Sequence, residues 1–245
     1  MNRLFAAGCV LTLSLFTPVL ADKGSEANPA AKKLNRDIDR HKEFLKRIEK
    51  SKGEGDVIFL GDSITHGWEG QKAWKEHFGA LKPVNLGIGG DQTGHVLWRI
   101  TEGKELEHLN PKVAVIMIGT NNTGAHSAKQ IAGGIKAIVE ELKKQKPSIK
   151  ILVLGVFPRG NRADADKETK TVPAAKLAKK IPAINAIIAG LDDGKTVFYK
   201  DIGKQFLDKN GGLSADIMPD YLHLTPKGYD IWGRAIKGDI QKLLK

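Results

Sequence analysis

The sequence predicts a single α/β domain whose parallel sheet is covered by helices on both faces. Short apolar runs recur along the chain, and stretches of helical periodicity separate them. Strands that alternate with helices in this way form parallel sheets, because each helix returns the chain to the same edge of the sheet. The length from about residue 22 to residue 245 fits one such domain, since single α/β domains commonly reach about 200–250 residues.

Five apolar runs have the length and composition of buried parallel strands. The predicted strands are Val57–Leu60, Pro83–Leu86, Val113–Ile118, Ile149–Val156 and Thr196–Tyr199. The predicted helices between them are Gln92–Glu102, Ser127–Gln145 and Ala174–Leu191. A closing helix runs to Leu244, because Thr225 is a good N-cap and Pro226 a good first helical residue.

The first 21 residues predict a signal peptide. Arg3 supplies a positive charge before the apolar stretch Leu4–Leu20, and Val19-Leu20-Ala21 has the small-residue pattern of a cleavage site. The apolar stretch contains polar residues and a proline and is short of the roughly 20 residues that a membrane-spanning helix needs, so no stable membrane anchor is expected. The prediction is a secreted or periplasmic protein.

Residues 22–52 predict a leader followed by a surface helix. Asp22–Pro29 has the composition of a flexible leader. Ala30–Lys52 carries apolar residues at helical spacing among charged ones, namely Leu34, Ile38, Leu45 and Ile48. Residues 53–245 then form the main domain.

Composition excludes several classes of function. The formal net charge of +11 favours anionic surroundings. The lysine pairs fall in helical segments without interleaved aromatic residues, so no nucleic-acid partner is expected. The only cysteine, Cys9, lies in the predicted signal peptide, which excludes disulfides, thiol catalysis and cysteine-bound zinc from the mature chain.

Neither a metal nor a cofactor is expected. The histidines at 66, 77, 95, 108 and 126 lack metal-ligand spacing such as H-E-x-x-H. Gly87-Ile88-Gly89-Gly90 has Gln92 where a dinucleotide-binding loop needs its third glycine. Thr65 likewise replaces the closing glycine of the G-x-S-x-G turn found in α/β-hydrolases.

Ser63, His223 and Asp220 together predict nucleophilic catalysis. A serine hydroxyl is a poor nucleophile and needs a base within hydrogen-bond reach, a carboxylate that orients the base, and donors for the oxyanion that develops. Ser63 follows a predicted strand at the start of a helical turn, and Asp220 precedes His223 by three residues in a predicted loop. Each feature also has an ordinary structural explanation, since serine, aspartate and histidine all occur as caps of helices.

Gly90 and Asn121 are the candidate oxyanion donors. Both follow predicted strands at the same edge of the sheet, so a backbone N–H and a side-chain amide can point into one cavity. Asn121 and Asn122 are equally common in simple turns.

The motifs at these positions resemble the four blocks of the SGNH, or GDSL-like, hydrolases. The blocks are Gly61-Asp62-Ser63-Ile64, Gly90, Gly119-Thr120-Asn121-Asn122 and Asp220-Tyr221-Leu222-His223. From about Val57 to Leu244, the chain further resembles the catalytic subunits of the type I platelet-activating factor acetylhydrolases. That likeness is carried by Asn85–Asp91, His95–Arg99, Gly133–Ile138 and Asp220–Leu224.

The resemblance implies a fold and a site. The implied fold is a flavodoxin-like three-layer α/β/α sandwich with a central parallel five-stranded sheet, formed by an SGNH hydrolase domain over residues 53–245. The implied roles are Ser63 as nucleophile, Asp220 and His223 as the other triad members, and Ser63 N–H, Gly90 N–H and the Asn121 side chain as the oxyanion hole.

The expected function is a secreted serine carboxylic-ester hydrolase that removes short acyl groups, acetyl above all, from an ester of a small molecule or a carbohydrate. A lysophospholipase or thioesterase of the same fold is one alternative, and a non-catalytic module that binds anionic polysaccharide is another. The charged stretch Arg159–Val172 is expected to be a mobile loop near the site that sets the substrate range. Trp68 is expected to pack the core. The oligomeric state is left open.

Overall fold

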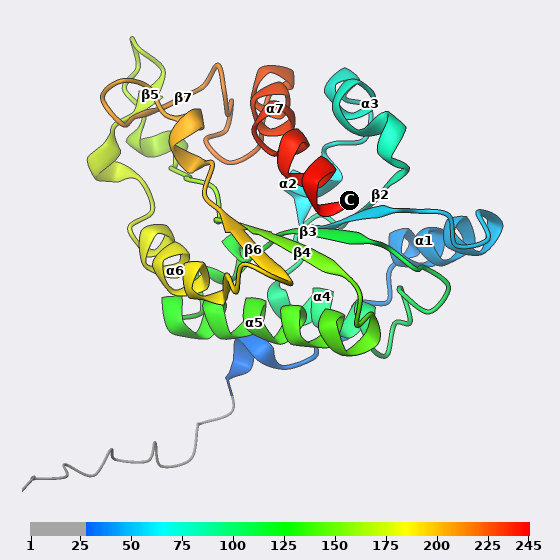
Figure 1. Ribbon diagram of the computed structural model, residues 1–245. Coiled ribbons are helices and arrows are strands. Elements are labelled where there is room, and N and C mark those ends of the chain that lie inside the picture. The colour runs from blue at the N-terminus through cyan, green and yellow to red at the C-terminus, as the bar shows by residue number, and fades with distance from the viewer. Residues whose placement is uncertain (1–27) are drawn as a thin grey trace, which may run out of the picture.

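The protein is built on a parallel five-stranded sheet in the order β2-β1-β3-β4-β6 (Figure 1). The computed structural model describes residues 28–245, so the predicted signal peptide and most of the predicted leader lie outside the described residues. The strands of the sheet are β1 Val57–Gly61, β2 Pro83–Gly87, β3 Val113–Met117, β4 Lys150–Leu154 and β6 Val197–Lys200. Two short strands, β5 Thr171–Val172 and β7 Leu213–Ser214, pair antiparallel outside this sheet.

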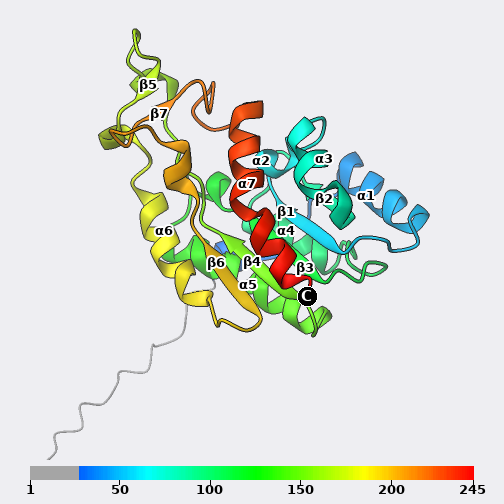
Figure 2. The same ribbon diagram turned by 45° about the horizontal axis from the view of Figure 1, so that its top comes forward.

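Helices cover both faces of the sheet, which confirms the predicted three-layer α/β/α sandwich (Figures 1 and 2). One outer layer holds α4 Thr93–Ile100, α5 Ala128–Gln145 and α6 Lys180–Ile188, with α1 Asp39–Lys50 beside the β2 end of the sheet. The other holds α2 Ser63–His66, α3 Lys72–Phe78 and α7 Pro226–Leu243. Short 3-10 turns complete the chain at η1 Pro29–Ala31, η2 Gly79–Leu81, η3 Thr120–Asn122, η4 Arg162–Asp164, η5 Ala174–Lys176, η6 Ala189–Leu191 and η7 Gly203–Phe206.

The two faces of the sheet bury different kinds of side chain. Alternate residues of a strand point to opposite faces, so Ile58 and Leu60 of β1 join one core cluster and Val57 and Phe59 the other. The first cluster, here the aliphatic layer, packs under α1, α4, α5 and α6 and consists almost wholly of isoleucine, leucine, valine and alanine. The second, here the aromatic layer, packs under α2, α3 and α7 and contains Trp68, Phe78, Tyr229 and Trp232.

The N-terminal helix is shorter than the sequence predicts. Residues 32–38 are not helical, and α1 begins only at Asp39. Leu34 donates its backbone N–H to the carbonyl of Gly94 in α4 at 3.0 Å and not to a carbonyl of its own segment. A tertiary contact thus overrides a local helical pattern.

The predicted helix Ala174–Leu191 is shortened to Lys180–Ile188, and a proline limits where it begins. Pro182 has no N–H to donate and fits only in the first turn of an α-helix, so α6 cannot begin at Ala174. The segment Arg159–Val172, predicted as a loop, includes η4 and β5. It does lie beside the predicted site, because Gly160 donates its N–H to the carbonyl of Tyr221 at 3.0 Å. Within residues 28–245, no helix is both long and apolar enough to cross a membrane.

Candidate active site

Ser63, His223 and Asp220 form one chain of hydrogen bonds. The Ser63 Oγ lies 2.8 Å from His223 Nε2, and His223 Nδ1 lies 2.6 Å from Asp220 Oδ2. Ser63 is the first residue of α2, directly after β1, and Asp62 caps this short helix by accepting the N–H of Ile64 at 2.9 Å. Ser63 and His223 are 160 positions apart in the sequence, and the folded chain brings them together.

The loop before α7 has the shape that aims His223 at Ser63. Tyr221 adopts a left-handed backbone conformation with φ of 61°, and Asp220 Oδ1 accepts the backbone N–H groups of Leu222 and His223 at 3.1 and 2.7 Å. Burial alone would raise the pKa of Asp220, but hydrogen bonds from the His223 side chain and from these two N–H groups hold it below its ordinary value. The carboxylate is thus kept ionised, as the orienting partner of an imidazole must be.

Gly90 and Asn121 flank Ser63 at the carboxyl end of the sheet. Because β1 lies between β2 and β3, the loops that follow these two strands stand on either side of the residue that follows β1. A Cβ built on Gly89 would lie 3.9 Å from the Cβ of Ser63, which shows how closely the first loop approaches the serine. Asn121 Nδ2 donates to the carbonyl of Asp91 at 2.9 Å, which joins the two loops.

The backbone N–H groups of Ser63 and Gly90 are not used in internal hydrogen bonds among the described residues. Gly90 is exposed and has a φ of 77°, a conformation that glycine adopts without strain. Backbone N–H groups without an internal partner remain able to donate to a bound substrate.

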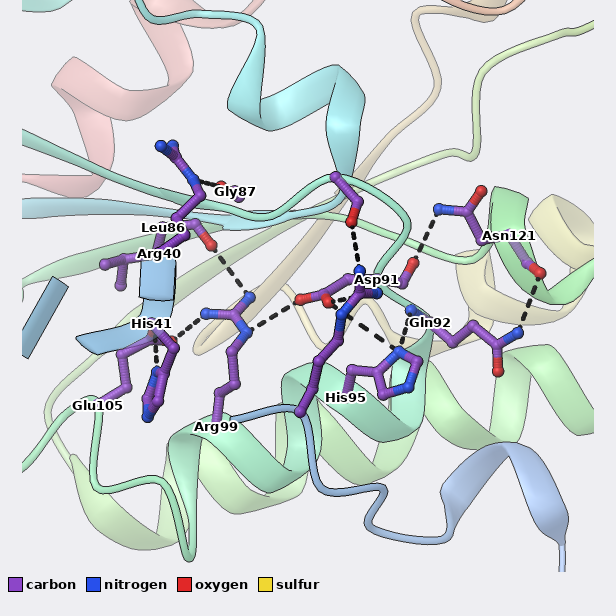
Figure 3. A network of polar contacts seen from close by, with 12 residues as sticks. Arg40, His41, Leu86, Gly87, Asp91, Gln92, His95, Arg99, Glu105 and Asn121 are labelled. Atoms are coloured by element: carbon purple, nitrogen blue, oxygen red, sulfur yellow. Dashed lines mark hydrogen bonds and ion pairs between the residues drawn. The ribbon is translucent and has the colours of Figure 1, made fainter. Parts of the chain in front are cut away.

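A buried cluster of ion pairs supports the loop that carries Gly90, and sequence reasoning missed its role. Arg99 is fully buried and donates its Nε to Asp91 Oδ2 at 2.9 Å, its Nη1 to Glu105 and its Nη2 to the carbonyl of Leu86 at 3.0 Å (Figure 3). Glu105 also faces the buried ring of His41. The signal in the sequence is a charged residue between the apolar residues Trp98 and Ile100.

Two arginines of the N-terminal segment also reach this loop. Arg36 Nη2 donates to the carbonyl of Gly89 at 2.7 Å, and Arg40 Nε donates to the carbonyl of Gly87 at 2.8 Å. Neither was a candidate from sequence, because nothing local to residues 36–40 indicates contact with residues 53 and 47 positions away.

Two other histidines, His66 and His95, have lowered pKa values. His95 Nδ1 accepts the N–H of Gln92 at 2.9 Å, and burial together with Arg36 and Arg99 lowers the pKa of His95 to about 4. Burial and Arg40 also lower the pKa of His66. In the part of the chain that is described, no group of three histidine, cysteine or acidic residues is placed to hold a metal ion.

The profile of the GDSL-like Lipase/Acylhydrolase family matches residues 59–231. The chain belongs to this family. The human platelet-activating factor acetylhydrolase IB subunit alpha1 is 36% identical over 228 residues, which are 89% of this chain and 92% of that protein. The chicken alpha2 subunit is 37% identical over 78% of each chain. A solved GDSL-like lipase from Bacteroides thetaiotaomicron shares the fold, with a TM-score of 0.64 and 24% identity over 82% of this chain and 97% of that one.

This GDSL-like acylhydrolase is a serine ester hydrolase. The family resemblance inferred from the motifs is confirmed, and the assignment favours an enzyme over the alternative of a non-catalytic binding module.

The prediction of a secreted or periplasmic protein is wrong by the same comparison. The curated relatives of the GDSL-like acylhydrolase are intracellular platelet-activating factor acetylhydrolase IB subunits and not secreted proteins. The prediction rested only on the charge and apolarity of residues 1–21. Those residues describe only the N-terminus, whereas the comparison with the human alpha1 subunit covers 89% of the chain.

Proposed function

We propose that the enzyme removes short acyl groups, acetyl above all, from carboxylic esters through an acyl-enzyme formed on Ser63. The contact of 2.8 Å between Ser63 Oγ and His223 Nε2 is the observation that carries the proposal. At this distance the imidazole can take the hydroxyl proton as the oxygen attacks.

The reaction then follows from the three side chains. Ser63 Oγ bonds to the ester carbonyl carbon while its proton passes to His223 Nε2, and Asp220 stabilises the imidazolium through Nδ1. Collapse of the tetrahedral intermediate breaks the bond to the alcohol oxygen, which leaves with the proton from His223. Water attacks the acyl-enzyme in the same manner, and the acid and free Ser63 are released.

The oxyanion of each tetrahedral intermediate is assigned to three donors, namely the N–H groups of Ser63 and Gly90 and the side-chain amide of Asn121. One N–H of that amide already bonds to the carbonyl of Asp91, which leaves the second for the substrate. A single donor of this kind contributes about 2.7–4 kcal/mol to stabilisation of the transition state.

A short acyl group and an open alcohol site are supported by the surroundings of Ser63. Trp68, which could have lined an acyl groove, is fully buried against Tyr229 and Trp232, with ring centroids 4.8 and 5.0 Å apart. The His223 side chain is 43% exposed, so the alcohol side of the site is open enough for a bulky group such as a carbohydrate. The names of the curated relatives also specify an acetylhydrolase.

Turnover of p-nitrophenyl esters from acetyl to palmitoyl tests the proposal. Ser63→Ala and His223→Ala are each expected to lower kcat for the acetyl ester by about 10⁴-fold or more. The matched control is Ser51→Ala, at the end of α1, which should keep full activity. Retained turnover in Ser63→Ala would refute the mechanism, and a preference for palmitoyl over acetyl would favour the lysophospholipase or thioesterase alternative.

A further inference from the structure

We propose that Arg36 is a positioning residue that sets the direction and strength of the Gly90 N–H as an oxyanion donor. The inference rests on the proposed function, because it assigns Arg36 a role in the reaction at Ser63. It concerns one peptide unit, the bond between Gly89 and Gly90, whose carbonyl and N–H point in opposite directions.

Arg36 binds the carbonyl end of that peptide unit. Its Nη2 donates to the Gly89 oxygen at 2.7 Å, and its Nη1 lies 3.1 Å from Asp91 Oδ1. Asp91 is fully buried, and the Arg36 side chain is only 26% exposed. The two contacts use both arms of a rigid guanidinium, so the residue is clamped on both sides of Gly90.

The peptide needs such a clamp because both of its residues are glycines. Glycine crosses between backbone conformations at little cost, and Gly90 is already in the left-handed region with φ of 77°. Without a partner for the Gly89 carbonyl, this peptide plane could rotate and change the direction of the Gly90 N–H. The bond from Arg36 fixes the plane, and a charged donor on the carbonyl polarises the peptide, which makes its N–H a stronger donor.

Asp91, the second partner of Arg36, connects the two loops of the proposed oxyanion hole. Asp91 accepts Asn121 Nδ2 at its backbone carbonyl and Arg99 Nε at its carboxylate, both at 2.9 Å (Figure 3). Arg36 is therefore the outer cation of a cluster that orients both the backbone donor and the amide donor. It acts through Gly89 and Asp91 and need not touch the substrate.

Arg40 provides a contrast within the same loop. Its Nε donates to the Gly87 carbonyl at 2.8 Å, but the N–H of that peptide belongs to Ile88 and already donates to Gly61 at 3.2 Å. The plane of this peptide is held at both ends. Arg40 also pairs with Glu69 through two hydrogen bonds, at 2.9 and 3.1 Å. Its loss should weaken the fold locally without freeing a catalytic donor.

The test compares Arg36→Met with Arg40→Met, using p-nitrophenyl acetate and an alkyl boronic acid that forms a tetrahedral, oxyanion-like adduct on the serine. Arg36→Met should lower kcat by about 10- to 100-fold, the range expected when a donor is misplaced and not deleted. Its KM should change less than about twofold, and its affinity for the boronic acid should fall by the same factor as kcat. Arg36→Lys, which keeps the charge but not the fork, should fall between Arg36→Met and the wild type.

Arg40→Met should keep kcat and boronic acid affinity within about threefold of the wild type while its thermal unfolding midpoint falls. Equal losses of kcat in the two Met variants, or wild-type boronic acid affinity in Arg36→Met, would overturn the inference. If Arg36→Met does not fold, Arg36→Lys decides by the same two measurements. If an Arg36 variant is fully active and Ser63→Ala is inactive, only this inference is contradicted. If Ser63→Ala is itself active, the proposed function is contradicted.

Discussion

Asp62 and Glu105 are both fully buried carboxyl groups, yet their surroundings move their acidities in opposite directions. Asp62 lies between β1 and α2, where burial raises its pKa to about 7 although the N–H of Ile64 donates to its carboxylate. Burial acts on Glu105 too, but Arg99 and His41 hold the pKa of Glu105 below its ordinary value. Among residues 28–245, Asp62 forms no ion pair, whereas Glu105 faces both Arg99 and His41.

This difference extends to the two halves of the proposed site. Ser63 and the helix that begins with it rest on the aromatic layer, where Tyr229 on α7 donates its hydroxyl to the carbonyl of Ile64 at 2.8 Å. Gly90 and Asn121 are held instead by the ion pairs around Asp91 and Arg99, on the face of the aliphatic layer. Ser63 is thus positioned by packing, and Gly90 and Asn121 are positioned by charge. The two halves should respond differently to mutation and to pH.

Replacing Arg99 with methionine should produce the largest effect. It leaves Asp91 and Glu105 buried without their main cation, and breaking a buried pair typically costs about 3–5 kcal/mol of unfolding free energy. We expect a loss at or above that range by urea denaturation, with lower esterase activity. The control Lys33→Met breaks only an exposed pair with Glu102 and should leave the unfolding free energy unchanged. Equal stabilities of the two variants would contradict the electrostatic half of the comparison.

Asp62→Asn should change how stability depends on pH. A raised folded pKa means that the folded state binds the proton more tightly, so stability is full below about pH 4 and is lost as pH rises to about 7. Asparagine keeps the acceptor for Ile64 and carries no charge. The variant should therefore gain unfolding free energy over the wild type between pH 4 and pH 8, on the order of 4 kcal/mol.

Glu105→Gln is the matched control, measured by urea denaturation at the same pH values. Since the pKa of Glu105 is lowered, its contribution to stability is present above the ordinary glutamate pKa and is lost as pH falls. This variant should lose stability relative to the wild type as pH rises, the opposite sign to Asp62→Asn. The same sign in both variants would show that the two buried acids do not differ as described.

Tyr229→Phe should have the smallest effect. It removes one hydrogen bond and leaves the Ile64 carbonyl without that donor, for an expected loss of about 1–2 kcal/mol in urea denaturation. Because Trp68 and Trp232 still pack beneath α2, kcat should fall less than tenfold. Tyr199→Phe is the control, since no hydrogen bond from its hydroxyl is found among the described residues. A larger loss from Tyr199→Phe would count against the role assigned to Tyr229.

The sequence by itself determined the α/β fold and the positions of the five central strands. Apolar runs such as 57–60 and 113–118 are local signals, because a strand buried on both faces must be apolar throughout. Thr225 and Pro226 likewise set the start of α7, since a cap acts on the residues beside it. The motif residues Ser63, Gly90, Asn121 and His223 were also found from the sequence, and their catalytic roles stay predictions until the variants above are measured.

Only the tertiary structure decided what holds those residues in place. Arg36 reaches a loop 53 residues away and Tyr229 a carbonyl 165 residues away, and no local pattern specifies such contacts. The start of α1 was missed for the same reason, because the backbone of Leu34 bonds to Gly94 of α4. Periodicity and capping report energies between neighbours in the chain. Buried ion pairs and shared peptide planes depend on which segments the folded chain brings together.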